Sequence, residues 1–325
     1  MTAIRTENLN ISYGNLDIVK DLNINIPKGK ITTIIGANGC GKSTVLKTIA
    51  RIIQPKSGDI YINDKNIKEQ SSKDLAKTMA VLPQSPQAPK GLTVEELIAY
   101  GRFPHQKGFG KLKKDDEDII TWALEVTGIK EFRHRPIEAL SGGQRQRAWI
   151  AMALAQQTDI LVLDEPTNHL DSDSIEWLEE YLNSRKGALL MITHDRYFLD
   201  RVSNKILELD RGNIYTYIGN YSAFLEKKAE RIELEAASEE KRQKLILKEL
   251  KWVRRGAKAR TTKQKARLQR FDDLINEEYI APKANLEMSF IGTRLGKKII
   301  ELKNISSLKI IKIFRGAIYS TGKMR

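Results

Sequence analysis

The chain has 325 residues, of which 41% are hydrophobic and 30% charged, with a formal net charge of +14; this is ordinary globular composition, long enough for about two domains of roughly 150 residues each. No run approaches the ~18 consecutive apolar residues of a membrane-spanning helix, and the first residues lack the charged-then-apolar leader of a secreted protein, so we expect a cytoplasmic chain without membrane insertion of its own. The single cysteine, Cys40, excludes an intramolecular disulfide and a zinc site built on several thiolates.

The first third of the sequence is typical of strands separated by turns. Strand patterns cover residues 4–14 and 21–29, and the run Ile31 to Ile35 is typical of a strand buried on both faces. This run ends in GANGCGKST, and the apolar spacing from Thr44 to Ile53 predicts a helix. The glycines are therefore expected in a strand-to-helix turn.

Residues 91–157 show amphipathic helical windows and no strand pattern, which predicts a helical insertion. Two buried strand patterns follow, DILVLD at residues 159–164 and GALLMIT at residues 187–193, with a helix expected around residues 175–182 between them. This β-α-β order is typical of a parallel sheet covered by helices, so the sequence predicts the α/β class.

The net positive charge is concentrated in one element. Residues 221–278 predict a long polar helical pair, broken near Gly256. Between Lys241 and Arg270 there are 13 Lys or Arg and one acid, which gives +12, whereas the other 295 residues hold 42 basic and 40 acidic side chains, or +2. Any attraction to RNA or another polyanion is therefore expected from this basic hairpin.

The cations nearest the expected turn of the basic hairpin are its candidate nucleic-acid contacts: Arg254, Arg255, Lys258 and Arg260. The alternative is a solvated helical pair, although a segment with a single acid offers few of the mixed-charge pairs that stabilise such helices.

The segment Gly36-x-x-x-x-Gly41-Lys42-Ser43 matches the Walker A pattern. Glycines let backbone amides point inward around a β-phosphate, and the following helix N-terminus adds positive potential. Lysine at this spacing bridges β- and γ-phosphates, and the serine hydroxyl binds Mg²⁺. An accidental turn is the alternative, and the flanking strand and helix patterns argue against it. The predicted ATP and Mg²⁺ site comprises Gly36, Asn38, Gly39, Cys40, Gly41, Lys42, Ser43 and Thr44.

Two further segments are candidates for the same site. Asp164 and Glu165 end the apolar run from Ile160, which places two carboxylates at the carboxyl edge of a buried strand, where open α/β sheets bind ligands. One such carboxylate can hold Mg²⁺ and the next can polarise the attacking water, and two solvated turn acids are the alternative. LSGGQRQR, at residues 140–147, either presents amides to phosphate or is only a capped helix start.

In this order the motifs resemble the full series of the ATP-binding cassette (ABC) ATPases, over residues 1 to about 220. The series comprises Tyr13, Walker A, Gln84, Leu140 to Gln144, LVLDEP, Asp171 and His194. The resemblance implies that ATP hydrolysis depends on Mg²⁺ bound by Ser43, Gln84 and Asp164. It also implies that Tyr13 stacks on adenine, Gln84 senses the γ-phosphate, Glu165 is the general base and His194 contacts the γ-phosphate.

In this family each nucleotide site is shared between two cassettes. The resemblance implies that Ser141, Gly142, Gly143 and Gln144 complete the site of the opposite cassette and that Asp171 lies at the shared interface, so hydrolysis requires a homodimer or a related second chain. His105, His134 and His169 match no catalytic position and are expected to be ordinary loop or surface residues.

The two parts of the chain resemble different ABC subfamilies. Residues 1 to about 163, with GANGCGKST and LSGGQRQRAWIAMALAQQ, resemble the ATPase subunit of iron-siderophore importers, whose helical insertion grips a membrane permease. Residues about 165 to 303, with EPTNHLDSDSIEWLEEYL and KWVRRGAKARTTKQKARLQRFDDL, resemble the first-cassette end and linker of ABC-F proteins, which act on ribosomes and approach the peptidyl-tRNA. The shared LDEPT marks the seam of a possible fusion.

These resemblances predict three parts: an ABC domain at residues 1–220, a basic helical hairpin at 221–278 and, from the strand-like KKIIELKNIS onward, a truncated remnant of a second cassette at 279–325. We expect an importer subunit at the inner face of the plasma membrane, because the 325 residues contain one Walker A motif where tandem ABC-F proteins need two. An ABC-F-like ATPase acting on ribosomes is the alternative, and it accounts better for the basic hairpin.

Overall fold

The computed structural model describes the backbone of residues 1–13, 16–106 and 112–254, and their side chains except at positions 13, 16 and 249–254. Residues Met1–Lys248 form one compact unit. The boundaries expected near residues 220 and 278 stay predictions. In the described ranges, no helix combines the length and the apolar character needed to cross a membrane.

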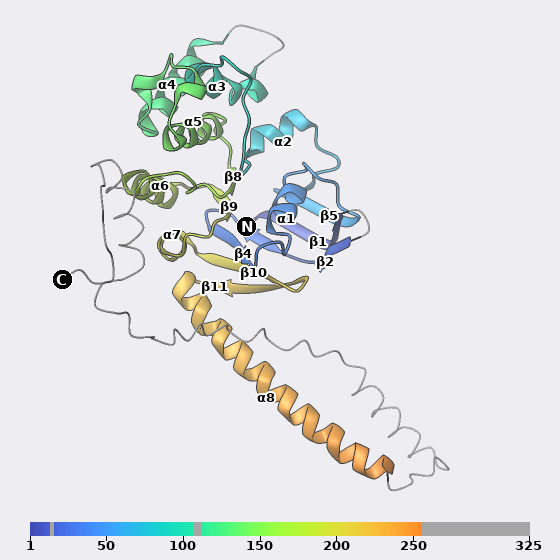
Figure 1. Ribbon diagram of the computed structural model, residues 1–325. Helices are drawn as coiled ribbons and strands as arrows, with labels where there is room; N and C mark the ends of the chain where they lie inside the picture. The colour runs from blue at the N-terminus through green and yellow to red at the C-terminus, as the bar shows by residue number, and fades with distance from the viewer. Residues whose placement is uncertain (14–15, 107–111, 255–325) are drawn as a thin grey trace, which may run out of the picture. The chain divides into compact units, whose positions relative to one another are not determined.

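The centre of the unit is a six-stranded sheet in the order β11-β10-β4-β9-β8-β7 (Figure 1). Every neighbouring pair is parallel except β10 with β11. The α/β class predicted from the sequence is confirmed. The strands span β4 Ile31–Gly36, β7 Met79–Leu82, β8 Ile160–Asp164, β9 Ala188–Ile192, β10 Lys205–Asp210 and β11 Asn213–Ile218.

The inner strands are buried on both faces, as their apolar runs predicted. In β8, Ile160 and Val162 join one hydrophobic cluster, whereas Leu161 and Leu163 join the other. This alternation follows from the two-residue period of a strand, which directs successive side chains to opposite faces. Both faces therefore need a covering layer of other elements.

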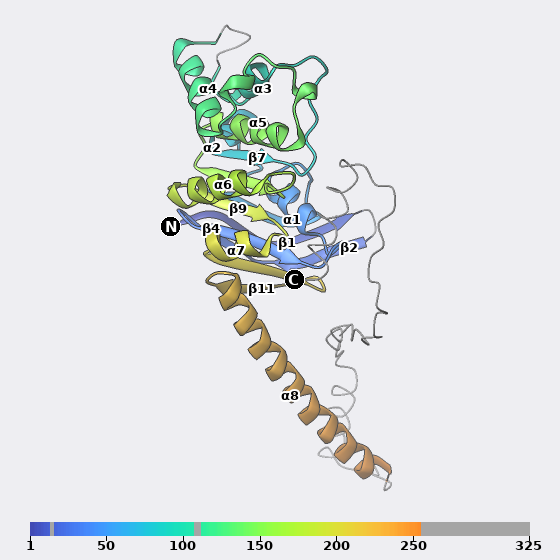
Figure 2. The ribbon, with the colours of Figure 1, turned by 60° about the vertical axis from the view of Figure 1, so that its left-hand side comes forward.

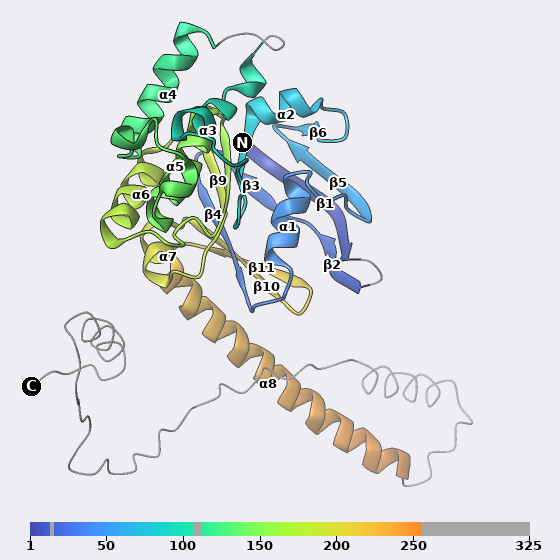
Figure 3. The ribbon, with the colours of Figure 1, turned by 45° about the horizontal axis from the view of Figure 1, so that its top comes forward.

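A second sheet, largely antiparallel in its pairing, and helix α1 cover one face (Figure 3). Its strands are β1 Thr2–Tyr13, β2 Leu16–Leu22, β3 Asn25–Pro27, β5 Ser57–Ile62 and β6 Lys65–Asn66, and α1 spans Lys42–Ile49. Side chains from β1, β5 and α1 share a core with β4, β8 and β9. The layer that covers this face therefore comes from both sides of the Walker A segment in sequence, β1 to β3 before it and α1, β5 and β6 after it.

Two local expectations were wrong. The strand expected over residues 21–29 is split between Leu22 and Asn25, where the Thr6 hydroxyl donates to the Leu22 carbonyl at 2.8 Å and accepts from the Ile24 N–H at 3.0 Å in place of strand pairing. As a result β2 pairs with the end of β1 and β3 with its beginning. The helix expected from Thr44 to Ile53 starts at Lys42 and ends at Ile49, and Arg51 then takes a left-handed φ of 58° that no helix interior allows.

Helices cover the other face of the central sheet (Figures 1 and 2). The predicted helical insertion contains α3 Val94–Tyr100, α4 Lys114–Val126 and α5 Gly142–Ala155, with short 3₁₀ turns at Phe103–His105, Lys130–Phe132 and Ile137–Ala139. Outside the insertion, the described residues also form α2 Ser72–Thr78, α6 Ser172–Ser184 and α7 Arg196–Val202. Apolar side chains from α3 to α7 pack together with β8 and β9 in a single cluster.

A buried ion pair ties the insertion together. Arg102 Nε donates to Asp116 Oδ1 at 2.8 Å, and the two side chains are 7% and 8% exposed. Arg102 Nη1 also donates to the Ala155 carbonyl at 2.8 Å, so one guanidinium joins the ends of α3, α4 and α5. Burial is the largest single influence and acts to raise the pKa of the Asp116 carboxyl, but the hydrogen bonds from Arg102 and from the Lys113 N–H, together with the Arg102 charge, lower that pKa below its usual value.

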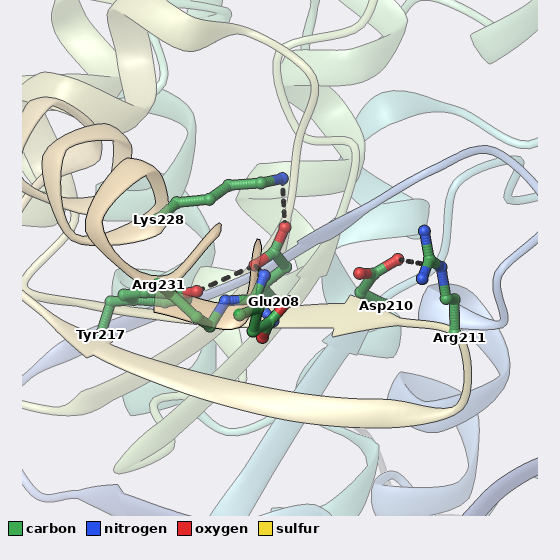
Figure 4. A network of polar contacts seen from close by, with 7 residues as sticks. Glu208, Asp210, Arg211, Tyr217, Lys228 and Arg231 are labelled. Carbon is green, nitrogen blue, oxygen red and sulfur yellow. Dashed lines mark hydrogen bonds and ion pairs between the residues drawn. The ribbon is translucent and has the colours of Figure 1, made fainter. Parts of the chain in front are cut away.

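Helix α8, Tyr221–Arg254, starts directly after β11 and is held by a buried carboxylate (Figure 4). Glu208 of β10 accepts hydrogen bonds from Lys228, from Arg231 at 2.9 Å and from the Tyr217 hydroxyl at 3.1 Å. Burial, followed by the Glu208 charge, raises the pKa of Tyr217 to about 12. The first turns of α8 therefore dock on the sheet through opposite charges, while the second arm of the predicted hairpin lies outside the described residues.

We expect Asp116→Ala to lower the free energy of unfolding by about 3–5 kcal/mol, because it leaves the Arg102 guanidinium buried without a counter-charge. The matched control is Asp115→Ala, which removes an exposed acid from the same first turn of α4 and should cost under about 1 kcal/mol. Guanidinium unfolding of both variants measures the difference.

The folded pKa of Asp116 is depressed, so this stabilisation should be full above the unfolded value of 3.8 and decline as pH falls below it. Equal unfolding midpoints for the two variants would show that the buried pair contributes no more than a surface acid.

Candidate active site

The Walker A segment forms the turn between β4 and α1. A side chain at Gly36 would place its Cβ 2.4 Å from the Leu209 carbonyl oxygen, and one at Gly41, where φ is 103°, would lie 2.1 Å from Ile18 Cγ2. Only glycine fits this close approach of the turn to its neighbouring strands. The first turn of α1 carries no capping side chain and no acid, so its free N–H groups and dipole favour an anion, as the motif predicted.

Lys42 is held against this turn. Its side chain is largely buried, and Nζ donates to the carbonyls of Gly36 and Ala37 at 3.0 Å each. The ammonium group therefore lies at the mouth of the loop, where the loop's backbone amides and its charge can act on the same phosphate chain. A cavity of about 300 Å³ borders the loop at Gly36 and Ala37 and extends to His194 and to Lys228 of α8.

Ser43 and Asp164 meet at the sheet edge. The Ser43 hydroxyl donates to Asp164 Oδ1 at 3.3 Å, which joins the start of α1 to the end of β8. Burial raises the pKa of the Asp164 carboxyl, and the Ser43 hydrogen bond offsets part of that rise. A hydroxyl beside a single carboxylate is an oxygen donor set of the kind that suits Mg²⁺, which takes its remaining ligands from water and phosphates.

Gln84 follows β7 at the same edge, because Leu82 pairs in parallel with Leu163 of β8. Its side chain is exposed and, among the residues that the structure describes, makes no hydrogen bond to Ser43 or Asp164. The structure therefore brings Gln84 to the correct edge but does not join it to the other predicted Mg²⁺ ligands.

Glu165 and His194 form a pair at the ends of β8 and β9. Glu165 has a φ of 54° and its N–H donates to the Ile192 carbonyl at 2.8 Å. Its carboxylate accepts from the His194 N–H at 3.3 Å, and Oε1 lies 3.2 Å from His194 Nε2. Burial raises the pKa of the Glu165 carboxyl, and His194 offsets this in part. A buried carboxylate of raised pKa beside an exposed imidazole is suited to accepting a proton from water.

The LSGGQ segment is a capped helix start, which was one of its two predicted meanings. Ser141 Oγ accepts from the Gln144 N–H at 3.3 Å, and Gln144 Oε1 accepts from the Ser141 N–H at 3.0 Å. Gly142 and Gly143 lie against His169, where a Cβ at Gly143 would be 3.0 Å from the His169 carbonyl oxygen. Ser141 and Gly142 are exposed, so their outer surface can be reached by another chain.

Asp171 is also a helix cap, at the start of α6. Its Oδ1 accepts from the Ser174 N–H at 3.0 Å and from Arg147 of α5 at 3.3 Å. Gln146 of α5 donates to the Pro166 carbonyl at 3.1 Å. Two consecutive side chains of α5 thus contact the segment between the Glu165 turn and α6, so hydrogen bonds link the LSGGQ helix to the sheet edge that carries Glu165.

The other predicted residues divide into two groups. His134 and His169 are exposed, and His105 Nε2 donates to the Gln156 carbonyl at 2.9 Å, so all three occupy loop or surface positions. The following lie outside the described side chains, and their roles stay predictions: Tyr13, Arg254, Arg255, Lys258 and Arg260.

The sequence analysis did not identify Thr167 and Thr193 as site residues. Their buried hydroxyls lie 3.1 Å apart, between the Glu165 turn and the His194 turn. The available signal was that each threonine lies within two residues of a candidate catalytic residue, Thr167 two positions after Glu165 and Thr193 directly before His194. Their contact depends on β8 and β9 being neighbours, which no local pattern states.

Family models and relatives agree with this geometry. A family model described as ABC transporter matches residues 19–168, and a second model with the same description matches residues 207–290. The iron(3+)-hydroxamate import ATP-binding protein FhuC of Bacillus subtilis is 56% identical over 218 residues, which is 66% of this chain and 81% of FhuC.

Relatives of the second kind match most of the chain. The ABC transporter ATP-binding protein YfmR of Bacillus subtilis is 39% identical over 338 residues, covering 94% of this chain and 52% of YfmR. The energy-dependent translational throttle protein EttA of Mycobacterium tuberculosis is 36% identical over 325 residues, covering 90% of this chain and 56% of EttA. The chain thus spans about half the length of these two relatives, and the predicted mixture of two resemblances is confirmed.

Among solved structures, cbiO1 from Clostridium perfringens, part of the ABC transporter complex cbiONQ, is 29% identical with a TM-score of 0.59 and covers 71% of this chain and 93% of cbiO1. A metal-chelate type ABC transporter in an inward-facing conformation is also 29% identical, with a TM-score of 0.58, and covers 67% of this chain and 84% of that one. The fold, the motif geometry and these relatives lead to one conclusion: the chain belongs to the ATP-binding cassette family of ATPases.

Proposed function

We propose that this protein is the ATP-binding subunit of an ABC importer of the iron-siderophore type and that it hydrolyses ATP in the presence of Mg²⁺. The observation that carries the proposal is the 56% identity to FhuC, an iron(3+)-hydroxamate import ATP-binding protein, over 81% of that protein. The active-site geometry supports the hydrolytic part of the proposal independently, because the loop, the hydroxyl and the two carboxylates lie at one sheet edge.

The chain's own residues divide the work of binding. Gly36 to Thr44 wrap the phosphates with backbone amides, and Lys42 adds its charge, while Tyr13 is assigned to the adenine ring. Ser43, Asp164 and Gln84 would hold Mg²⁺, which supplies charge neutralisation for the phosphates when bound. The hydroxyl-to-carboxylate contact of 3.3 Å supports the first two assignments, since both groups already face each other across the edge.

Glu165 is the group we assign to accept the proton of the attacking water. Its burial supports this role, because a carboxyl group whose pKa is raised toward neutrality is a better base than a solvated one. His194, which is 56% exposed at its side chain and already contacts Glu165, is assigned to the γ-phosphate. Both residues follow strands of the rigid sheet, so their positions relative to Lys42 depend on strand pairing.

We propose that a second cassette is one protein partner of this chain. Helices α5 and α6 carry the residues that we assign to the nucleotide site of the opposite chain: Ser141, Gly142, Gly143, Gln144 and Asp171. Their helix-capping role does not compete with this assignment, since Ser141, Gly142 and Asp171 are exposed as well as capping. A homodimer then places two complete sites at one interface.

We propose that a membrane permease is the other protein partner. The helical insertion carries an exposed aromatic pair, Tyr100 and Phe103, with ring centroids 5.6 Å apart and exposures of 42% and 55%. Exposed aromatic pairs supply rigid apolar area at protein interfaces, which supports this end of the cassette as the membrane-subunit contact. A cytoplasmic protein peripheral to the inner face of the plasma membrane fits this assignment.

The second candidate function is an ABC-F-like ATPase acting on ribosomes. It is favoured by the 39% identity to YfmR over 94% of this chain and by the +12 charge of residues 241–270. It accounts for α8 and the basic hairpin, which the importer assignment leaves without a role.

We expect Glu165→Gln to bind ATP normally and to lose steady-state hydrolysis by about 10²–10⁴-fold, the usual contribution of a general base. Glu180→Gln, an exposed acid of α6, is the matched control and should retain activity. Phosphate release measures turnover, and equilibrium binding of a fluorescent ATP analogue measures affinity. Wild-type turnover in Glu165→Gln would assign the base to another residue.

We expect Mg-ATP to convert Glu165→Gln from a monomer into a dimer of about twice 37.0 kDa, since the closed pair is not relieved by hydrolysis. Adding Ser141→Arg, which places a bulky charge on the exposed start of α5, should abolish dimerisation. Light scattering at saturating ATP measures the mass. A monomer in Glu165→Gln itself would contradict the shared-site assignment.

The partner assignment is tested with two crossed variants. We expect the protein to co-purify with a membrane permease, and Tyr100→Ala with Phe103→Ala to weaken that association. Changing Arg254, Arg255, Lys258 and Arg260 to Gln should leave it intact. If the protein pellets with ribosomes in the presence of ATP, the result would instead favour the ABC-F-like function. Binding through phosphates should make log K for the ribosome fall against log salt with a slope of about −0.7 per phosphate contact, and the four Gln substitutions should make this slope shallower.

A further inference from the structure

Two buried threonines join the turns that carry Glu165 and His194. Thr167 follows β8 and Thr193 follows β9; their side chains are 9% and 2% exposed, and their Oγ1 atoms lie 3.1 Å apart. A hydroxyl has one proton and two acceptor lone pairs, and burying it without a partner is unfavourable. Each hydroxyl therefore gains a hydrogen-bond partner from the other.

Thr193 also fixes the backbone on the far side of His194. Its Oγ1 accepts from the Asp195 N–H at 3.2 Å, which closes a local turn around the His194 peptide. Asp195 in turn caps α7, since its Oδ1 accepts from the N–H groups of Tyr197 and Phe198 at 3.1 Å each. The backbone is thus held at residue 193 by Thr167 and at residue 195 by Thr193 and α7.

The consequence lies between these two fixed points. With the peptide held in this turn, the His194 N–H donates to Glu165 Oε2 at 3.3 Å and the imidazole lies 3.2 Å from Oε1. Glu165 is held from its own backbone as well, through the hydrogen bond to the Ile192 carbonyl at 2.8 Å. The contact between the Thr167 and Thr193 side chains joins the turn that carries Glu165 to the turn that carries His194.

We propose that Thr193, held by Thr167, is a positioning residue for ATP hydrolysis: its hydroxyl orients the His194 peptide toward Glu165 and so sets the position of both groups. The inference rests on the proposed roles of Glu165 and His194. It concerns the geometry of the pair and not the binding of nucleotide, because neither threonine belongs to the Walker A loop.

Thr193→Val keeps the shape of the side chain and removes the hydroxyl. We expect kcat to fall about 10- to 100-fold, the size of effect when a buried hydrogen-bond partner is lost, while the KM and the equilibrium affinity for ATP stay within about twofold. Thr193→Ser, which restores the hydroxyl, should recover most of kcat. The matched control is Thr127→Val, which removes an equally buried hydroxyl from the end of α4 and should leave kcat unchanged.

A second readout needs no turnover. The chain has four histidines, so protein labelled with ¹⁵N-histidine gives four backbone amide signals, and His194→Gln identifies one by its loss. We expect the His194 amide signal of the nucleotide-free protein to move upfield in Thr193→Val and in Thr167→Val, because its hydrogen bond weakens. It should stay in place in Thr193→Ser and in Thr127→Val.

A double-mutant cycle completes the test. If the two hydroxyls act as one unit, Thr167→Val with Thr193→Val should reduce kcat little more than either change alone. An unmoved His194 signal in Thr193→Val, or a loss of kcat that Thr193→Ser does not recover, would overturn the inference. If the His194 signal moves in Thr193→Val but the wild-type protein shows no ATPase activity, the positioning geometry is retained and the proposed function is rejected.

Discussion

Strand β4 pairs with β9 on one side and with β10 on the other, and this pairing positions the candidate site. Gly36 pairs with Leu209 of β10, and Ile34 pairs with Ile192 of β9. These registers bring the phosphate-binding turn, which leaves β4, beside the His194 turn, which leaves β9. A slip of one residue would turn every side chain of β4 to the opposite face and expose its apolar set, so burial on both faces holds this register firmly.

The same strand order explains how a chain with two resemblances forms one cassette. The strands on the importer-like side of the seam are β4, β7 and β8, and those on the ABC-F-like side are β9, β10 and β11. They alternate within the sheet, since β4 lies between β10 and β9, and β9 lies between β4 and β8. Neither part can bury its strands alone, and the candidate site combines Ser43 from one part, His194 from the other, and Asp164 and Glu165 from the shared seam.

Buried carboxylates serve two different purposes in this fold. Glu208 meets two cations of α8 and a tyrosine hydroxyl, so its charge is balanced and the helix is held on the sheet. Asp164 and Glu165 meet one hydroxyl and one imidazole, and burial raises the pKa of both carboxyls. Unbalanced acids at a strand edge are costly to bury. A bound cation or a proton would complete this balance, in line with the roles proposed for Asp164 and Glu165.

Local patterns were enough to predict the α/β class, the Walker A turn, the acid pair at the end of β8 and the concentration of positive charge from Lys241 onward, because each depends on residues that are contiguous in the chain. The sequence predicted the strand over residues 21–29 wrongly, since the break between β2 and β3 depends on hydrogen bonds to Thr6 of β1, which no local pattern states. Only the tertiary structure decided that Glu165 contacts His194, that Thr167 contacts Thr193, and that Glu208 holds α8. These contacts join residues that lie 20 to 29 positions apart in the chain. They depend on a strand order that comes from burying two sheet faces at once.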